Sequence, residues 1–232
     1  MYFCNSQKLD LKLFRKKDLL VYIAGLVFAL ISVSIFYWIL KPQKTLPIFQ
    51  PATVNLKLVD SSIQYVSKYH KVSPFSLINQ NGDTITEQFY NGKIYVADFF
   101  FTTCQDICPI MTRNMHILQE KLKDDEEVLL LSHTVMPEID TVEILKKYSM
   151  DYNVDDNKWN LVTGDKEQIY NLARKSYLAA EDVEFRKYDL IHTENFVLID
   201  RESQIRGFYD GTKIDEISLL LDDLEILKNS YK

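Results

Sequence analysis

The chain has 232 residues, of which 47% are hydrophobic, and it carries a net charge of −6 at pH 7. This length allows one domain of ordinary size together with a shorter appendage. The acidic balance, without a basic stripe, argues against a nucleic-acid partner, because phosphate binding needs clustered lysine and arginine residues.

An apolar, uncharged stretch at residues 19–40 is the first element of the chain. As a helix it would be about 33 Å long, enough to cross a hydrocarbon core of about 30 Å. Basic residues are concentrated before it, so the positive-inside rule places residues 1–18 in the cytoplasm and the later residues outside. A cleaved signal peptide is the alternative, but its apolar region would be shorter and would end at a small-residue cleavage site. We therefore predict a single membrane anchor that is not removed.

The segment at residues 41–73 is expected to be a linker, because prolines punctuate it and no hydrophobic period is sustained. A compact domain is then expected at residues 74–232. It opens with two short strands within residues 75–86, joined by an Asn81-Gly82 turn of the kind that closes β-hairpins.

Strands and helices alternate through the rest of the domain. The apolar run at residues 93–101 is expected to form a central buried strand, followed by a helix at residues 109–123. Later strands are expected at residues 127–132, 159–162, 195–199 and 204–209, and later helices at residues 138–150, 165–175 and 213–228. In the helix at residues 138–150, we expect Ile144, Leu145 and Tyr148 to face inward. This order predicts an α/β fold, a thioredoxin-like mixed sheet flanked by helices.

Two of the three cysteines, Cys104 and Cys108, lie in the turn between the central strand and the helix that Pro109 begins. Backbone N–H groups at a helix start favour thiolates, and a helical turn brings positions i and i+4 to roughly 5–6 Å between their Cβ atoms. Such a pair can hold one metal ion or close into a disulfide. A purely structural disulfide is the simpler alternative, but a bridge over so short a loop constrains the chain little. Cys4 precedes the anchor and receives no role.

A histidine could complete a metal site with these cysteines. His192 directly precedes the strand at residues 195–199, in a loop that a thioredoxin-like fold brings to face the reactive turn. Two thiolates and one imidazole suit Cu(I) or Cu(II), and the same set could hold zinc. His70 in the linker and His116 in the middle of a helix are expected to have surface or core roles.

These residues resemble the Sco/SenC family of membrane-anchored, thioredoxin-like copper proteins, which assist assembly of cytochrome c oxidase. The matching stretches are GKIYVADFFFTTCQDICP at residues 92–109, WNLVTG at residues 159–164 and HTENFVLID at residues 192–200. The resemblance covers about residues 74–227 and implies that Cys104, Cys108 and His192 are the ligands of one copper ion. It also implies a bacterial plasma membrane or a mitochondrial inner membrane, and the lack of an Arg- and Ser-rich transit peptide favours the bacterial setting.

The sequence departs from the family pattern at two places. Family members usually carry proline where this chain has Gln105, and an Asp-Pro pair where it has Met136-Pro137. The second change removes a carboxylate near the metal loop, while His133 and Met136, both potential copper ligands, lie close by in the sequence. We expect His133 to cap a strand end and Met136 to fill space.

Two functions follow from these residues. The first is a copper chaperone without catalytic turnover. It would deliver copper to the copper centre of an oxidase subunit, or keep the thiols of that centre reduced, with an upstream copper donor or thiol reductant as a further partner. The second is a membrane-anchored thiol–disulfide oxidoreductase that uses Cys104 and Cys108 as a redox-active pair. A peroxide reductase with a single thiolate is a third alternative. His192 separates the first two, because copper binding uses it and dithiol exchange does not.

Overall fold

The computed structural model describes residues 16–41, 44–179 and 193–231, and it divides the chain into two compact units, Met1–Lys44 and Thr45–Lys232. The first unit contains helix α1 (Lys16–Leu40). Its segment Leu19–Leu40 has a mean hydropathy of 2.6 and no buried part, so it is long and apolar enough to span a membrane. This helix is a candidate for the predicted anchor.

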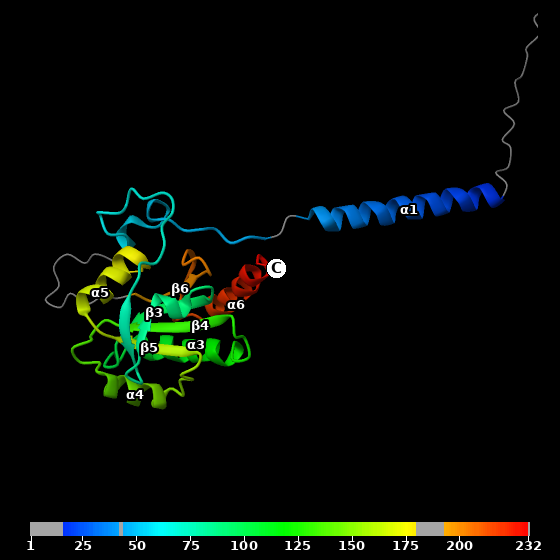
Figure 1. Ribbon diagram of the computed structural model, residues 1–232. Coiled ribbons are helices and arrows are strands. Elements are labelled where there is room, and N and C mark those ends of the chain that lie inside the picture. Colours follow the sequence, from blue (N-terminus) through cyan, green and yellow to red (C-terminus); the bar gives the residue numbers. More distant parts are fainter. Residues whose placement is uncertain (1–15, 42–43, 180–192, 232) are drawn as a thin grey trace, which may run out of the picture. The chain divides into compact units, whose positions relative to one another are not determined.

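The second unit is built on one mixed sheet of seven strands in the order β2-β1-β5-β4-β3-β6-β7 (Figure 1). Strand β3 lies between β4, to which it is parallel, and β6, to which it is antiparallel. The strands are β1 (Ser76–Asn79), β2 (Thr84–Thr86), β3 (Ile94–Phe100), β4 (Val128–Thr134), β5 (Trp159–Thr163), β6 (Asn195–Ile199) and β7 (Ile205–Asp210). This arrangement is the thioredoxin-like mixed sheet that the sequence predicts.

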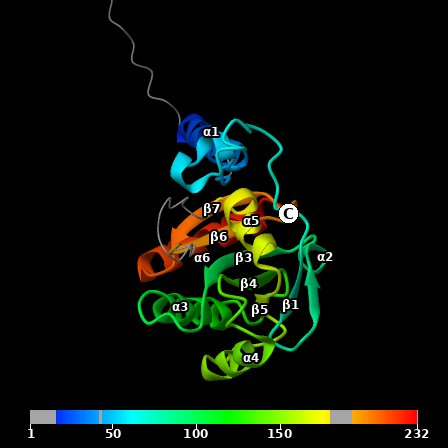
Figure 2. The same cartoon turned by 90° about the vertical axis from the view of Figure 1, so that its left-hand side faces the viewer.

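Helices cover both faces of this sheet, as Figures 1 and 2 show from two sides. The helices are α2 (Glu87–Tyr90), α3 (Cys108–Lys121), α4 (Val142–Asp151), α5 (Lys166–Asn171) and α6 (Ile214–Asn229), with a π-helix (Leu172–Ser176) after α5. Buried residues of α3, α4 and α6 form one apolar cluster with one face of the sheet. Buried residues of α2, α5 and the π-helix form a second cluster on the opposite face.

The compact unit begins earlier than the predicted boundary at residue 74. Residues 45–73, which we call the strap, contain two 3-10 turns (Pro51–Thr53 and Leu56–Leu58) and pack on the domain. Val59 and Val72 are buried in the second cluster, and the N–H of Phe49 donates to the carbonyl of Ile205. The expected linker is therefore corrected: prolines end regular structure, but they do not prevent apolar side chains between them from packing.

Most predicted elements are present, with differences at their ends. The hairpin of β1 and β2 is confirmed, with Gly82 at a φ of 84°. Helix α4 begins at Val142, later than expected, because Thr141 caps it by accepting from the N–H of Ile144. Leu145 is fully buried, but the expectation that Ile144 faces inward is wrong, since 40% of it is exposed.

Candidate metal and thiol site

Strand β3 delivers the two cysteines to one edge of the sheet. All seven of its residues are buried, and a short loop, residues 101–107, leads from it to the first residue of α3, Cys108. Pro109 lies in the first turn of that helix, where its missing N–H costs no hydrogen bond. Cys104 is partly exposed in the loop, whereas Cys108 is buried in the cluster under α3. The structure thus brings the two predicted site residues together.

The two thiol groups differ in their electrostatics. Burial raises the pKa of Cys108 to about 12, and its hydrogen bond to Cys104 acts in the same direction. For Cys104, burial is outweighed by the hydrogen bond from Cys108 and by the N–H groups of residues 106–108, so its pKa is lowered. Of the two thiols, Cys104 is therefore the one that ionises more easily, with the buried Cys108 thiol as a hydrogen-bond donor to it.

Besides the buried thiol of Cys108, a buried carboxylic acid, Asp98, lies on the face of β3 that packs in the same cluster. Asp98 is 2% exposed, and burial raises its pKa to about 7, partly offset by a hydrogen bond from the Ser132 hydroxyl. Ser132 in turn accepts from the indole N–H of Trp159 at 2.8 Å. The Oδ1 atom of Asp98 has no hydrogen-bond partner in the described part of the chain, and the charge of Asp98 contributes to the raised pKa of Cys108. The sequence analysis missed Asp98, although a lone acid within an aromatic strand was a visible signal.

Asp140 was also missed. It is fully buried at the end of the turn before α4, and its carboxylate accepts from both the N–H and the hydroxyl of Thr102, two residues before Cys104. The hydroxyl of Thr134, at the end of β4, donates to the same carboxylate. Sequence offers no signal for this contact, because 38 residues separate Asp140 from Thr102. A carboxylate therefore supports the cysteine loop even though the Asp-Pro pair is absent.

His133 and Met136 belong to the opposite face of the sheet from Cys108. His133 is fully buried, stacks on Phe99 with ring centroids 4.8 Å apart, and donates from Nδ1 to the carbonyl of Asp98 at 3.3 Å. Burial lowers its pKa to about 4, so the ring is neutral. Met136 packs against the same cluster as Phe99. Met136 fills space as expected, whereas the expectation that His133 caps a strand end is wrong, because His133 lies within β4 and packs among aromatic rings.

His192, the third predicted ligand, lies outside the described residues. Strand β6 pairs with β3 so that Val197 lies opposite Ala97, which puts the start of β6 at the edge where β3 ends. At this edge the hydroxyl of Thr193, the next residue after His192, accepts from the N–H of Asn195. Within residues 16–41, 44–179 and 193–231, no cluster of three or more His, Cys, Asp or Glu side chains could hold a metal ion.

The other two histidines have local partners. In the strap, Nε2 of His70 lies 2.9 Å from the carbonyl of Ser176, at the end of the π-helix. In α3, Nδ1 of His116 lies 3.4 Å from the side-chain nitrogen of Gln119. Both contacts fit the structural roles that we expect for these residues.

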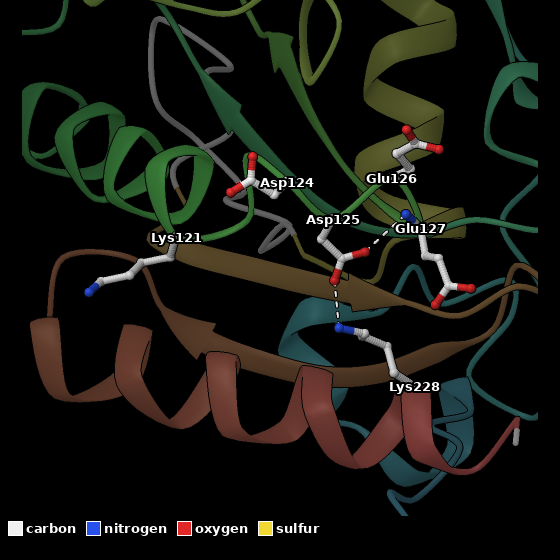
Figure 3. A pocket seen from close by; sticks show the side chains of 6 residues that line it. All are labelled: Lys121, Asp124, Asp125, Glu126, Glu127 and Lys228. Atoms are coloured by element: carbon white, nitrogen blue, oxygen red, sulfur yellow. Dashed lines mark hydrogen bonds and ion pairs between the residues drawn. The ribbon is translucent and has the colours of Figure 1, made fainter.

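A charged hollow near the far end of α3 is separate from the cysteines (Figure 3). Its Asp125 accepts from Nζ of Lys228 at 2.5 Å and from the N–H of Glu127 at 3.0 Å, so its carboxylate is already satisfied. The lining residues are Lys121, Asp124, Asp125, Glu126, Glu127 and Lys228. We assign it no binding role.

Comparison with known proteins identifies the relatives of this fold and site. A family model described as SCO1/SenC matches residues 64–227. The "SCO1 protein homolog" of Bacillus subtilis is 31% identical over 67% of this chain and 82% of its own length. The structure of BsSco, a member of the Sco family of cytochrome c oxidase assembly proteins with an identified disulfide switch, is 31% identical with a TM-score of 0.58 and covers 68% of this chain and 93% of its own. Copper-bound ScoI of Arabidopsis thaliana is 27% identical with a TM-score of 0.54, over 66% of this chain and 97% of its own.

With its CxxxC turn, its thioredoxin-like sheet and a family match over most of its length, this chain belongs to the SCO1/SenC family.

Proposed function

We propose that this protein is a membrane-anchored copper chaperone that takes part in assembly of cytochrome c oxidase. It holds one copper ion with Cys104, Cys108 and His192 and passes it to the copper centre of an oxidase subunit. The observation that carries this proposal is the pairing of Cys104, which is partly exposed, with the buried Cys108 at the start of α3. Family membership and the copper-bound relative from Arabidopsis support it.

A soft, three-ligand site suits transfer of the metal. Thiolate sulfur favours Cu(I), and an added imidazole accommodates Cu(II) as well. An exposed Cys104 can exchange ligands with an incoming acceptor, while the buried Cys108 keeps its place on the helix. The copper ion is cargo here: the thiols would release their protons when it binds and take protons up again when it leaves.

Competition for Cu(I) tests this function. The reduced full-length chain in detergent is titrated against a chromophoric Cu(I) chelator under anaerobic conditions, in a Cys4→Ser background that leaves two thiols. We expect one tightly held equivalent, weakened by Cys104→Ser, Cys108→Ser and His192→Ala. His116→Ala is the matched control and should bind as tightly as the parent. Copper binding that does not depend on His192 would contradict the three-ligand site.

A thiol–disulfide oxidoreductase is the second candidate, and the partly exposed Cys104, whose pKa is lowered, beside a buried Cys108 favours it. Cys104 would attack a partner disulfide, release one partner thiolate and form a mixed disulfide. Cys108 would then give up its proton, attack the sulfur of Cys104 and release the second thiolate, so the partner gains two electrons, while its two thiolates take up the proton of Cys108 and one from solvent. His192→Ala should leave this activity intact, whereas Cys108→Ser should trap the mixed disulfide.

We further propose that α1 anchors the chain in a bacterial plasma membrane, with the N-terminus in the cytoplasm and the domain outside. The length and apolar character of Leu19–Leu40 support the anchor. The excess of basic residues before it supports the orientation. Intact cells treated with a membrane-impermeant thiol reagent should therefore show labelling of Cys104 and not of Cys4; labelling of Cys4 alone would reverse the topology.

A further inference from the structure

Asp140 is a buried carboxylate whose charge has no cationic partner in the described part of the chain. It is fully buried, and three donors surround it: the N–H and hydroxyl of Thr102 and the hydroxyl of Thr134. Burying a carboxylate costs free energy even when hydrogen bonds satisfy it, so apolar packing would stabilise this position at least as well. Its presence therefore calls for a role other than overall stability.

The main chain around Asp140 is held by local hydrogen bonds. Its own N–H donates to the carbonyl of Met136 at 2.9 Å, and the next residue, Thr141, caps α4. Thr134 is held as well, because its hydroxyl accepts from the N–H of Met136 at 3.0 Å. The carboxylate thus extends from a fixed turn toward the cysteine loop.

Asp140 holds Thr102, the second residue after the end of the strand that leads to the cysteines. Phe100, the last residue of β3, pairs with Thr134, and Thr102 follows two residues later. The N–H of Cys104 then turns back to the carbonyl of Phe101 at 3.3 Å, and the N–H groups of residues 106–108 point to the Cys104 sulfur. Two hydrogen bonds to Thr102 therefore set where this loop starts.

We propose that Asp140 is a positioning residue for the metal and thiol site: by fixing Thr102 it orders the loop that carries Cys104, so that the two sulfurs are already in place when copper or a partner disulfide arrives. This inference rests on the proposed function of Cys104 and Cys108. Residues behind the ligands commonly affect metal affinity 10- to 100-fold, about the size expected here.

The test compares Asp140→Ala, Asp140→Asn and Thr102→Val in the full-length, Cys4→Ser chain. Two quantities are measured: the affinity for Cu(I) against a competing chelator, and the equilibrium of the cysteine pair with glutathione, which needs no copper. Asp200→Ala is the matched control. Asp200 is a buried aspartate that also accepts three hydrogen bonds, from Glu202, Gln204 and Arg206, but it follows β6 at the opposite edge of the sheet.

Asp140→Ala should lower the Cu(I) affinity about tenfold or more and shift the glutathione equilibrium, with Asp140→Asn intermediate. Asp200→Ala should lower the melting temperature while leaving both quantities unchanged. Equal shifts in both aspartate variants, or none in a folded Asp140→Ala chain, would overturn the proposal. If Asp140→Ala does not fold, Thr102→Val decides, because it removes one hydroxyl and keeps the backbone. If the parent chain binds no copper, the proposed function fails, and the glutathione equilibrium still tests Asp140.

Discussion

Arg206 and Asp200 form an ion pair between β7 and the residue that follows β6. Nη1 of Arg206 lies 2.9 Å from Oδ2 of Asp200, whose side chain is fully buried. The same guanidinium donates through Nη2 to the carbonyl of Leu46 at 2.6 Å and through Nε to the carbonyl of Pro47 at 2.9 Å. One side chain of β7 therefore holds both a buried acid and the beginning of the strap.

Arg206→Ala should destabilise the domain by about 3 kcal/mol, because it leaves a buried carboxylate without its cation. Thermal unfolding followed by the fluorescence of the buried Trp159, in a Trp38→Phe background, measures the change. Lys146→Ala breaks the exposed pair with Asp156 and should cost less than about 1 kcal/mol. Equal losses of stability in the two variants would show that the contacts of Arg206 with Asp200 and the strap contribute no more than an exposed ion pair.

Two neighbouring residues of α4 test the orientation of that helix. Leu145→Ala should cost about 2–5 kcal/mol, because it opens a cavity in the cluster shared with α3. Ile144→Ala should cost less than about 1 kcal/mol, since 40% of Ile144 is exposed. Urea unfolding of both variants measures the difference. A larger loss for Ile144→Ala would mean that α4 is turned the other way.

Asp98 contributes to the stability of the metal-free domain, and this contribution should fall as the pH rises from about 4 to about 7. Burial raises the pKa of Asp98 from 3.8 to about 7, so the folded chain keeps a proton that the unfolded chain has released. The resulting stability is fully present below about pH 4 and is lost as the pH rises through about 7.

Asp98→Asn removes that dependence, because an amide has no proton to lose. The variant should gain stability relative to the parent by up to about 1.4 kcal/mol per pH unit across this window. Urea unfolding at several pH values measures the gain, with the capping variant Asp165→Asn as a control that keeps the parent slope. A parent-like slope in Asp98→Asn would show that Asp98 is ionised throughout.

Copper removal should lower the stability of the chain. A ligand at about 100 times its dissociation constant stabilises the folded state by about 2.7 kcal/mol, so a strong Cu(I) chelator should return the melting temperature to that of the metal-free chain. The double variant Cys104→Ser/Cys108→Ser should melt at one temperature with or without copper. A copper-dependent rise in that variant would locate the metal elsewhere.

The strongest periodic patterns predicted the fold well. The aromatic strand before the cysteines and the Met111–Met115–Leu118 spacing are local signals, and all three of these side chains are fully buried on α3. The strap was not predicted, because its apolar residues, such as Val59 and Val72, follow no period and find partners only in three dimensions. Ile144 failed because adjacent residues of a helix point in different directions, so burial of Leu145 turns Ile144 toward solvent.

The residues of the candidate site also divide into those that the sequence predicts and those that it does not. Cys104 and Cys108 are recognisable because their spacing on a strand–helix turn is itself the chemical signal. Asp98 and Asp140 are not, since their roles depend on burial and on contacts with Ser132 and Thr102 that no sequence pattern records. The two cysteines can therefore be identified from the local sequence, whereas the two aspartates can be identified only from the folded structure.

The packing of the strap decides where a soluble fragment of this protein can begin. A chain cut at residue 74 would lose the carbonyl acceptors of Arg206 and would uncover the apolar surface on which Val59 and Val72 lie, while the ring of Phe208 would lose its edge contact with Phe49. Uncovered apolar surface of this kind promotes self-association. A fragment that begins at residue 44 keeps these contacts and should stay monodisperse where the shorter one precipitates.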